Sequence, residues 1–409
     1  ITTGTFIGMD SITNYNSATL VNNGTITITK VNNSATIENN ETLATTTINN
    51  AGAFQNTEMV TATDINNTVT FGNTGTLIAT TVINSGTFAN GGSINASDID
   101  NTVIFGNTGT LAASNSVTNS GTFSNTGIFT TTNLNSSETL ENSGTLNVTT
   151  FINEGNTLGD GVYNIIGDFT SSGVFFSDAG SVFMNGTSLQ TMTMAATTFN
   201  NLTINNAASV TLVSTQTVIT NNLTINTEKV FKIEADKNLT VTGTVDNYGG
   251  TSGLILKSNA SGTASLLHNT LNVPVTVQRY ISGTAEDWHF LSAPVSNQDI
   301  SGSWNPSGTY GNGTGYDLYI FNEPTPCWTY QLNTTVAPTW PSIHPTANFV
   351  TARGYLYSTQ AANPTKEFIG LLNNGTISYP ITNVSPDLVV QGFNLIGNPY
   401  PSSIDWKSI

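Results

Sequence analysis

The chain has 409 residues, enough for two or three domains, and only 8% of them are charged, with a formal net charge of −16. Residues 1–227 hold 13 acids against one base, Lys30, which argues against nucleic acid or an anionic membrane surface as a partner, because both bind basic stripes. The single cysteine, Cys327, excludes an intrachain disulfide, and no run of 18 apolar residues predicts a membrane span.

A repeat of 17 residues dominates the first part of the chain. Its units start at positions 14, 31, 48, 65, 82, 99, 117, 134 and 151, so every step is 17 residues except one of 18. A fixed period of this length is the sequence mark of a solenoid, in which stacked units bury a shared core.

Each unit carries three large apolar residues, at positions 1, 7 and 13, spaced 6, 6 and 5 residues apart. In one unit they are Ile48, Phe54 and Val60, and mostly polar or small residues alternate around them. This alternation is the strand signal. We therefore predict an all-β protein that begins with a parallel β-helix of 17-residue coils, with three short strands per coil.

Asparagine occupies two further columns, and glycine a third. Position 9 is Asn in all eight units that reach it, and position 3 is Asn except at Ser136. A stacked Asn amide can bond the backbone at a corner and the Asn above and below it, so we predict Asn ladders. Position 11 is often Gly, for example Gly92 and Gly109, which suggests a positive φ there.

Hydroxyl residues form outward columns in the same repeat. Position 16 is Thr or Ser in every unit, and position 12 is Thr in five of eight. If odd positions point inward, both columns lie on one face, and a flat Thr array can order water. Ice binding is therefore a minor hypothesis beside ordinary exposed β-branched residues.

The strict period loosens after the repeat, and the composition changes again near Val273. We expect a regular β-helix at 1–158, wider irregular coils of the same helix at 159–272, with a separate β-sandwich as the alternative for that stretch, and an antiparallel β-sandwich-like domain at 273–409. All five Trp, nine of twelve Tyr and all 13 Pro lie in this last segment.

The last segment contains phrases that resemble a known module. They are Arg279-Tyr280-Ile281, Trp288-His289-Phe290-Leu291-Ser292-Ala293-Pro294-Val295, Ala352-Arg353-Gly354-Tyr355-Leu356-Tyr357, Gly392-Phe393-Asn394-Leu395-Ile396-Gly397-Asn398-Pro399-Tyr400-Pro401 and Ile404-Asp405-Trp406. Together they resemble a module of large secreted, adhesin-like proteins of Bacteroidetes, the cargo of the type IX secretion system. In such proteins it often follows an Asn/Thr-rich β-helix.

The resemblance implies export by the type IX secretion machinery to the cell surface or the medium. It also implies that this chain is a piece of a longer protein, without the signal peptide and the C-terminal sorting domain. Asp10-Ser11-Ile12 is similar to the O-glycosylation site of these proteins.

Many β-helix proteins are polysaccharide lyases or hydrolases, so the predicted fold is compatible with enzyme activity. A lyase generally needs a basic residue, and residues 1–227 offer only Lys30. Hydrolysis needs two carboxylates about 5–9.5 Å apart. Asp64 and Asp98 share position 17 two coils apart, and Asp100 is close to Asp98, but solvated turn acids are the preferred interpretation. Glu41 and Glu58 could stack around a cation or splay into water.

The remaining reactive residues give no site pattern. His268, His289 and His344 lack metal-ligand spacing, and His289 is expected to be a satisfied core or edge residue. Cys327 is expected to be a small apolar residue rather than a nucleophile. Trp304, Trp328 and Trp340 are assigned to core packing, with stacking on sugar rings as the alternative. No catalytic, cofactor-binding or metal-binding residue is therefore predicted.

The sequence thus favours a non-enzymatic extracellular structural or adhesive protein, in which the β-helix is a stiff acidic stalk. The partners expected besides the secretion machinery are surface glycans or other cells. One alternative is a carbohydrate-binding or carbohydrate-active secreted protein. Another is the subunit of an extracellular filament built by end-to-end stacking.

Overall fold

A computed structural model describes residues 4–15, 17–195, 197–214, 216–306 and 316–405. The protein is all-β, with a parallel β-solenoid of about 16 turns and antiparallel sheets toward the C-terminal end. The chain divides into two compact units: residues 1–210 with 214–220, and residues 211–213 with 221–409. Trp406, which closes the last of the phrases quoted above, lies outside the described residues.

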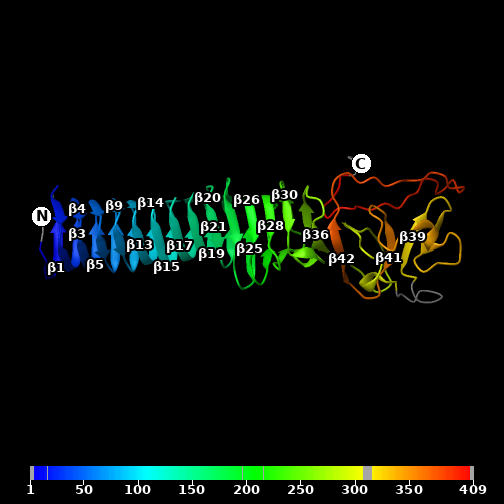
Figure 1. Ribbon diagram of the computed structural model, residues 1–409, viewed down its shortest axis with the longest axis horizontal. Helices are drawn as coiled ribbons and strands as arrows, with labels where there is room; N and C mark the ends of the chain where they lie inside the picture. The colour runs from blue at the N-terminus through cyan, green and yellow to red at the C-terminus, as the bar shows by residue number, and fades with distance from the viewer. Residues whose placement is uncertain (1–3, 16, 196, 215, 307–315, 406–409) are drawn as a thin grey trace. The chain divides into compact units, whose positions relative to one another are not determined.

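The strands of the regular coils follow one another in parallel ladders (Figure 1). In chain order they are β1 (Phe6–Asn14), β2 (Thr19–Asn22), β3 (Thr25–Asn33), β4 (Thr36–Asn39), β5 (Thr42–Asn50), β6 (Ala53–Asn56), β7 (Met59–Thr61), β8 (Asp64–Asn67), β9 (Thr70–Asn73), β10 (Thr76–Ile78), β11 (Thr81–Asn84), β12 (Thr87–Asn90), β13 (Ser93–Asn101), β14 (Ile104–Asn107), β15 (Thr110–Asn119), β16 (Thr122–Asn125), β17 (Ile128–Ser136), β18 (Thr139–Asn142), β19 (Thr145–Asn153) and β20 (Asn156–Leu158).

The pairing register confirms the repeat. Phe88 lies opposite Phe71 and Phe105, and Phe105 lies opposite Phe123, so the single 18-residue step adds its extra residue without breaking the column. The first step differs from the prediction. Val31 pairs with Ile12 and not with Asn14, so the first coil is longer by two residues and its unit begins at Ile12.

The three apolar columns form the core of these coils. From Ile26 to Phe151, every residue at positions 1, 7 and 13 is at most 3% exposed. Leu20, the first residue of the position 7 column, is half-buried. The Phe rings at position 7 stack nearly parallel, with centroids 4.6 to 4.9 Å apart from Phe54 to Phe123. Each Phe therefore packs on its equivalents in the coils before and after it.

A fourth inward column lies at position 15, in addition to the three columns of large apolar residues. It holds small or β-branched side chains such as Ala62, Ala96 and Val148, all buried. In the long strands two consecutive residues then face outward, as in β17, where Thr132 and Asn133 are both exposed between buried neighbours. Positions 16 and 17 therefore form a bend within one nine-residue strand. The assumption that all odd positions point inward is wrong, and the position 16 hydroxyls line that bend.

Two Asn ladders run through the coils, as predicted. At position 9, Asn90 accepts a hydrogen bond from Asn73 Nδ2 at 2.8 Å and donates to Asn107 Oδ1 at 2.7 Å. The same amide of Asn90 donates to the backbone oxygen of Thr110 in the next coil at 3.1 Å. The position 3 ladder has the same geometry, and where Ser136 replaces Asn its hydroxyl accepts from Asn119 at 3.0 Å.

The position 11 glycines do not have a positive φ, contrary to the prediction. The described glycines with positive φ lie elsewhere, Gly159 among them. At position 11 the reason for glycine is a close approach of the backbone. A Cβ on Gly109 would lie 2.1 Å from the carbonyl oxygen of Gly92 in the preceding coil. A side chain at Gly109 would therefore meet the Gly92 backbone, whereas Glu41 and Glu58 occupy the same column in earlier coils.

Beyond residue 158 the coils widen. Paired residues lie 18 apart for Asn156 and Val174 and 27 apart for Asn238 and Ser265. The strands here are β21 (Val162–Ile165), β22 (Phe169–Ser171), β23 (Val174–Phe176), β24 (Ser181–Met184), β25 (Gln190–Met194), β26 (Thr197–Ile204), β27 (Val210–Leu212), β28 (Val218–Ile225), β29 (Phe231–Ile233), β30 (Asn238–Val241), β31 (Val245–Asn247), β32 (Leu254–Leu256) and β35 (Ser265–Leu267).

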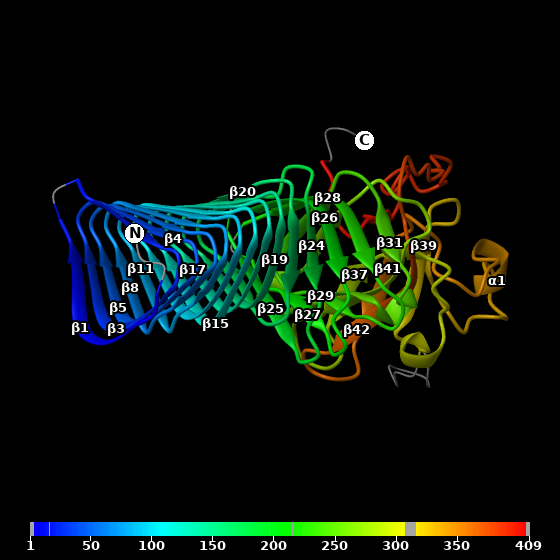
Figure 2. The same cartoon turned by 60° about the vertical axis from the view of Figure 1, so that its left-hand side comes forward.

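The second unit changes from parallel to antiparallel pairing at one strand. Strand β36 (Pro274–Tyr280) pairs parallel with β32 on one side and antiparallel with β42 (Thr365–Leu372) on the other. A separate four-stranded antiparallel sheet has the order β37-β41-β39-β40. Its strands are β37 (Trp288–Leu291), β41 (Tyr355–Ser358), β39 (Leu318–Asn322) and β40 (Cys327–Tyr330). Figure 2 labels three of these strands, β37, β41 and β39.

Short elements complete this unit, and its core is aromatic. Trp304 stacks on Phe368 with ring centroids 4.4 Å apart and meets Phe349 and Tyr357 edge-on. The described helices are a single turn each, too short to span a membrane. The remaining elements are β33 (Ser258–Asn259), β34 (Gly262–Thr263), β38 (Val295–Ser296), η1 (Gly250–Ser252), η2 (Gly302–Trp304) and α1 (Trp340–Ile343).

The Asn ladder predicts a large difference between two Asn→Ala substitutions. Asn90→Ala removes the amide that donates to Asn107 Oδ1 and Thr110 O, and one of the acceptors of the Asn73 amide, so we expect a loss of about 3 kcal/mol of unfolding free energy. Asn66→Ala, the control, removes one outer bond of 3.0 Å to Asn49 and should cost less than about 1 kcal/mol. Urea denaturation followed by circular dichroism measures both, and equal shifts would contradict the ladder's role.

The close approach of neighbouring coils predicts opposite outcomes at two glycines three residues apart. Gly109→Ala forces its Cβ against the Gly92 backbone and should destabilise the protein by about 2 kcal/mol or more. Gly106→Ala places its Cβ in open space, with Phe88 O at 3.9 Å, and should stay within about 0.5 kcal/mol of the parent protein. Thermal melting compares the two, and a tolerated Gly109→Ala would refute the steric explanation.

Candidate ligand-binding surface

The acids proposed for hydrolysis are separated along the solenoid. Asp64 and Asp98 lie on either side of Thr81 in the strand ladder, two coils apart, as the spacing predicted. Asp98 Oδ1 accepts hydrogen bonds from Asn115 Nδ2 at 2.7 Å and from Ser116 Oγ at 2.5 Å. Asp98 therefore supports the next coil through these hydrogen bonds.

Other acidic candidates lie on the outside of the solenoid. The side chains of Glu41 and Glu58 are exposed, as are Asp10 and Ser11 on strand β1. Among the described residues no group of three or more His, Cys, Asp or Glu side chains is arranged to hold a metal ion. Cys327 is half-buried, with Sγ 3.9 Å from the hydroxyls of Thr325 and Thr329.

Two of the three histidines are buried, and one faces a cavity. The His344 ring lies within 2.8 Å of the Tyr355 hydroxyl and 2.9 Å of the Thr346 carbonyl oxygen, and burial lowers its pKa to about 4. Burial also lowers the pKa of His268. His289 was expected to be satisfied, and this is wrong, because its buried Nε2 has no hydrogen-bond partner.

The described tryptophans divide into core and surface. Trp304 and Trp340 are buried, and Trp304 Nε1 donates to the backbone oxygen of Glu367 at 2.8 Å. Trp288 and Trp328 are each 42% exposed. The expectation of core packing therefore holds for Trp304 and Trp340 but not for Trp328, which lies on the opposite face of strand β40 from the buried Thr329.

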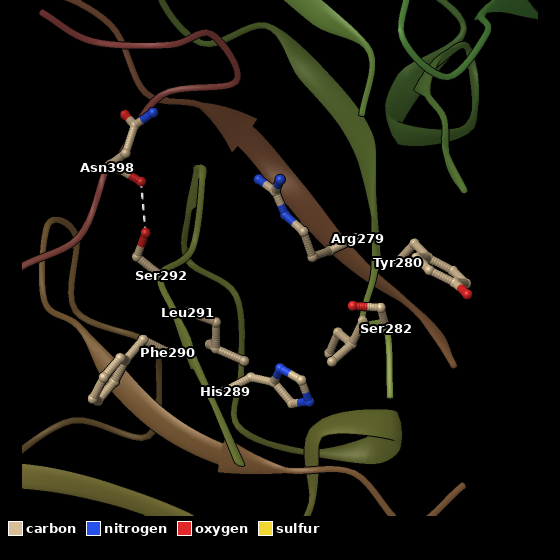
Figure 3. A pocket seen from close by; sticks show the side chains of 9 residues that line it. Arg279, Tyr280, Ser282, His289, Phe290, Leu291, Ser292 and Asn398 are labelled. Atoms are coloured by element: carbon tan, nitrogen blue, oxygen red, sulfur yellow. Dashed lines mark hydrogen bonds between the residues drawn. The ribbon is translucent and has the colours of Figure 1, made fainter. Parts of the chain in front are cut away.

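A polar cavity of about 370 Å³ lies between strands β36 and β37 (Figure 3). Its polar lining comes from Arg279, Ser282, His289, Ser292 and Asn398. Figure 3 shows the Arg279 guanidinium extending from β36 toward the side on which Ser292 and Asn398 lie. Ser292 Oγ donates to the backbone oxygen of Asn398 at 2.6 Å, which fixes the C-terminal segment over this cavity.

An aromatic cleft of about 560 Å³ lies next to the polar cavity, and Phe290 lines both. The Phe290 and Trp328 rings are inclined by only 21°, with centroids 6.4 Å apart. Phe290 is 68% and Phe393 62% exposed, so ring faces are presented to solvent. The cleft is completed by Phe321, Val390, Gly392, Asn394 and Leu395.

One buried carboxylate holds the far wall of this cleft. Glu323, 2% exposed, accepts backbone N–H bonds from Val384, Ser385 and Gly392 at 2.9 to 3.2 Å. Burial alone would raise the pKa of Glu323, but these N–H donors outweigh it and lower the pKa to about 2. The segment that carries Val390 and Phe393 is therefore tied to the hairpin that carries Trp328.

The convergence of these residues on one surface was not predicted from the sequence. Arg279, His289, Phe290, Ser292 and Asn398 all belong to the quoted phrases, which were used for the resemblance alone. A signal was nevertheless present, because Arg279 is one of only two arginines in the chain. Glu323 gave no signal, since its donors lie more than 60 residues away.

Glu323 and the backbone N–H groups that it accepts from are called the clamp below. Replacing Glu323 should loosen the far wall of the aromatic cleft. In Glu323→Gln the new side-chain NH2 group faces backbone N–H donors and cannot accept hydrogen bonds from them. Hydrogen exchange of the backbone amides at 382–392 should therefore accelerate by about tenfold or more. In the parent protein the clamp is complete above the ordinary pKa of 4.5 and is lost as the pH falls toward about 2. Hydrogen exchange by mass spectrometry measures this. Glu367→Gln, at an exposed glutamate, is the control, and equal protection in both variants would contradict the clamp.

The comparisons with known proteins identify a family without an assigned activity. No curated protein and no solved structure matches the chain. The family described as a domain of unknown function (DUF8693) matches residues 191–409, more than half of the chain, and this range contains both the polar cavity and the aromatic cleft. The chain belongs to this family.

Proposed function

We propose that this protein is a non-enzymatic extracellular structural and adhesive protein. In this proposal the solenoid is a stiff acidic stalk, and the C-terminal part presents the binding surface. The observation that carries the proposal is the use of polar groups in the regular coils. Their buried Asn amides bond one another and the backbone in every coil, so these groups serve rigidity.

The low charge density and the resemblance to type IX secretion cargo support export to the outer surface of a Gram-negative cell. Export can be tested with an epitope tag on the chromosomal gene of the source bacterium. Antibody labelling and protease removal of the tag on intact cells are the expected results. A tag that is reached only after cell lysis would overturn the surface location.

Carbohydrate binding is the second candidate, and the aromatic cleft favours it. Exposed, nearly parallel rings with a few polar neighbours are suited to the apolar faces of sugar rings. The clamp at Glu323 holds the cleft in place before a ligand arrives, which lowers the entropic cost of binding. In this case adhesion would proceed through surface glycans.

A matched pair of tryptophan substitutions tests this candidate. Trp328→Ala removes one wall of the cleft and should weaken glycan binding by about tenfold or more. Trp288→Ala is the control, since Trp288 is equally exposed but contacts Tyr319 away from the cleft. Binding of the full chain to a glycan array gives the readout. Equal binding by parent and Trp328→Ala protein would exclude the cleft.

A further inference from the structure

We propose that the polar cavity binds the carboxylate of an acidic sugar, a uronic-acid residue whose neighbouring residue in the saccharide lies on the aromatic cleft. This inference rests on the carbohydrate-binding candidate above and names the ligand class. It depends on three features: a cation without a carboxylate partner, polar groups that face the cavity, and the ring that the cavity shares with the cleft.

The first feature is Arg279. Its Nη1 donates to Thr263 Oγ1 at 3.2 Å, and the residue opposite it across the strand pair is another cation, Lys366. The single ion pair among the described residues is Lys257 with Glu234, so no described carboxylate neutralises Arg279. Burial lowers the pKa of this guanidinium, which nevertheless remains charged. A half-buried charge without a counter-ion is costly, and a ligand carboxylate would offset that cost.

The second feature is the set of polar groups around this cation. The buried Nε2 of His289 has no partner, and the exposed Ser282 lines the same cavity. Such groups bind ligand hydroxyls as well as a carboxylate. The cavity volume of about 370 Å³ falls within the range of about 300–1,000 Å³ that is typical of small-ligand sites.

The third feature is Phe290, which joins the cavity to the cleft. Strand β37 places His289 beside the cavity, while the ring of Phe290 points away from Arg279 (Figure 3). Phe290 also lines the cleft. A ligand that reaches across Phe290 therefore needs a carboxylate and hydroxyls at one end and an apolar ring face at the other. A saccharide with a uronic-acid residue has this combination.

The charge of the protein limits the ligand further. A net charge of −16 repels dense polyanions, and Arg279 offers one guanidinium. A saccharide with a single uronic acid beside neutral residues therefore fits better than a heavily charged chain.

The test is calorimetric titration of the full chain with a disaccharide of glucuronic acid and a neutral sugar, and with the same disaccharide carrying glucose instead. We expect the acidic disaccharide to bind at least about tenfold more tightly, and Arg279→Gln to abolish this difference. Lys257→Gln, which removes a half-buried cation that is paired with Glu234 and does not line the cavity, is the control and should keep the difference. Ser282→Phe, which fills the cavity without changing Arg279, should weaken the acidic ligand, so the test does not depend on one variant.

The possible results separate this inference from the function on which it rests. Equal binding of both disaccharides, lost in Trp328→Ala, would preserve carbohydrate binding and overturn the carboxylate assignment. Acetate or a peptide with a free C-terminal carboxylate binding as tightly as the acidic disaccharide would overturn the sugar assignment. If neither disaccharide binds and no glycan on the array is bound, both the carbohydrate-binding candidate and the carboxylate assignment are wrong.

Discussion

The structure depends on the burial of Asn amides at two corners of each regular coil. A parallel solenoid turns its backbone several times per coil, and each turn leaves N–H and C=O groups that strand pairing does not satisfy. The side chain of Asn90 meets this need by bonding its equivalents in both neighbouring coils and a backbone carbonyl of the next. The low charge and the abundance of Asn follow from this, because the coils need neutral groups that both donate and accept.

Much of the structure of the regular coils could be predicted because the 17-residue period is visible in the sequence. The apolar columns and the Asn ladders repeat residue by residue, and parallel stacking turns that periodicity into contacts. The errors concern backbone geometry within a coil. The residue types of Thr132 and Asn133 do not indicate that both side chains face outward. Glycine at position 109 is explained by the close approach of the Gly92 carbonyl oxygen in another coil, not by its own φ.

The C-terminal surface could not be predicted, since tertiary contacts between distant segments create it. Arg279 and Asn398 are 119 positions apart and line one cavity. Glu323 lies on a hairpin and holds backbone donors from a segment more than 60 residues later. A carboxylate that binds main-chain N–H groups leaves no pattern in a single sequence, whereas a column of Phe does. The short phrases that resemble a known module contain several of these residues without indicating that they meet.

The irregular positions of the Asn ladder have a consequence for folding. In a perfectly uniform stack, a coil could pair with the coil after next and still make every amide bond, so the chain would have many mispaired states of similar energy. Ser136 in place of Asn, the 18-residue coil and the long first coil interrupt this uniformity, so a shifted pairing would not reproduce all of their native contacts. These departures from the repeat specify the pairing register, so that a repetitive chain has a single lowest-energy order of its coils.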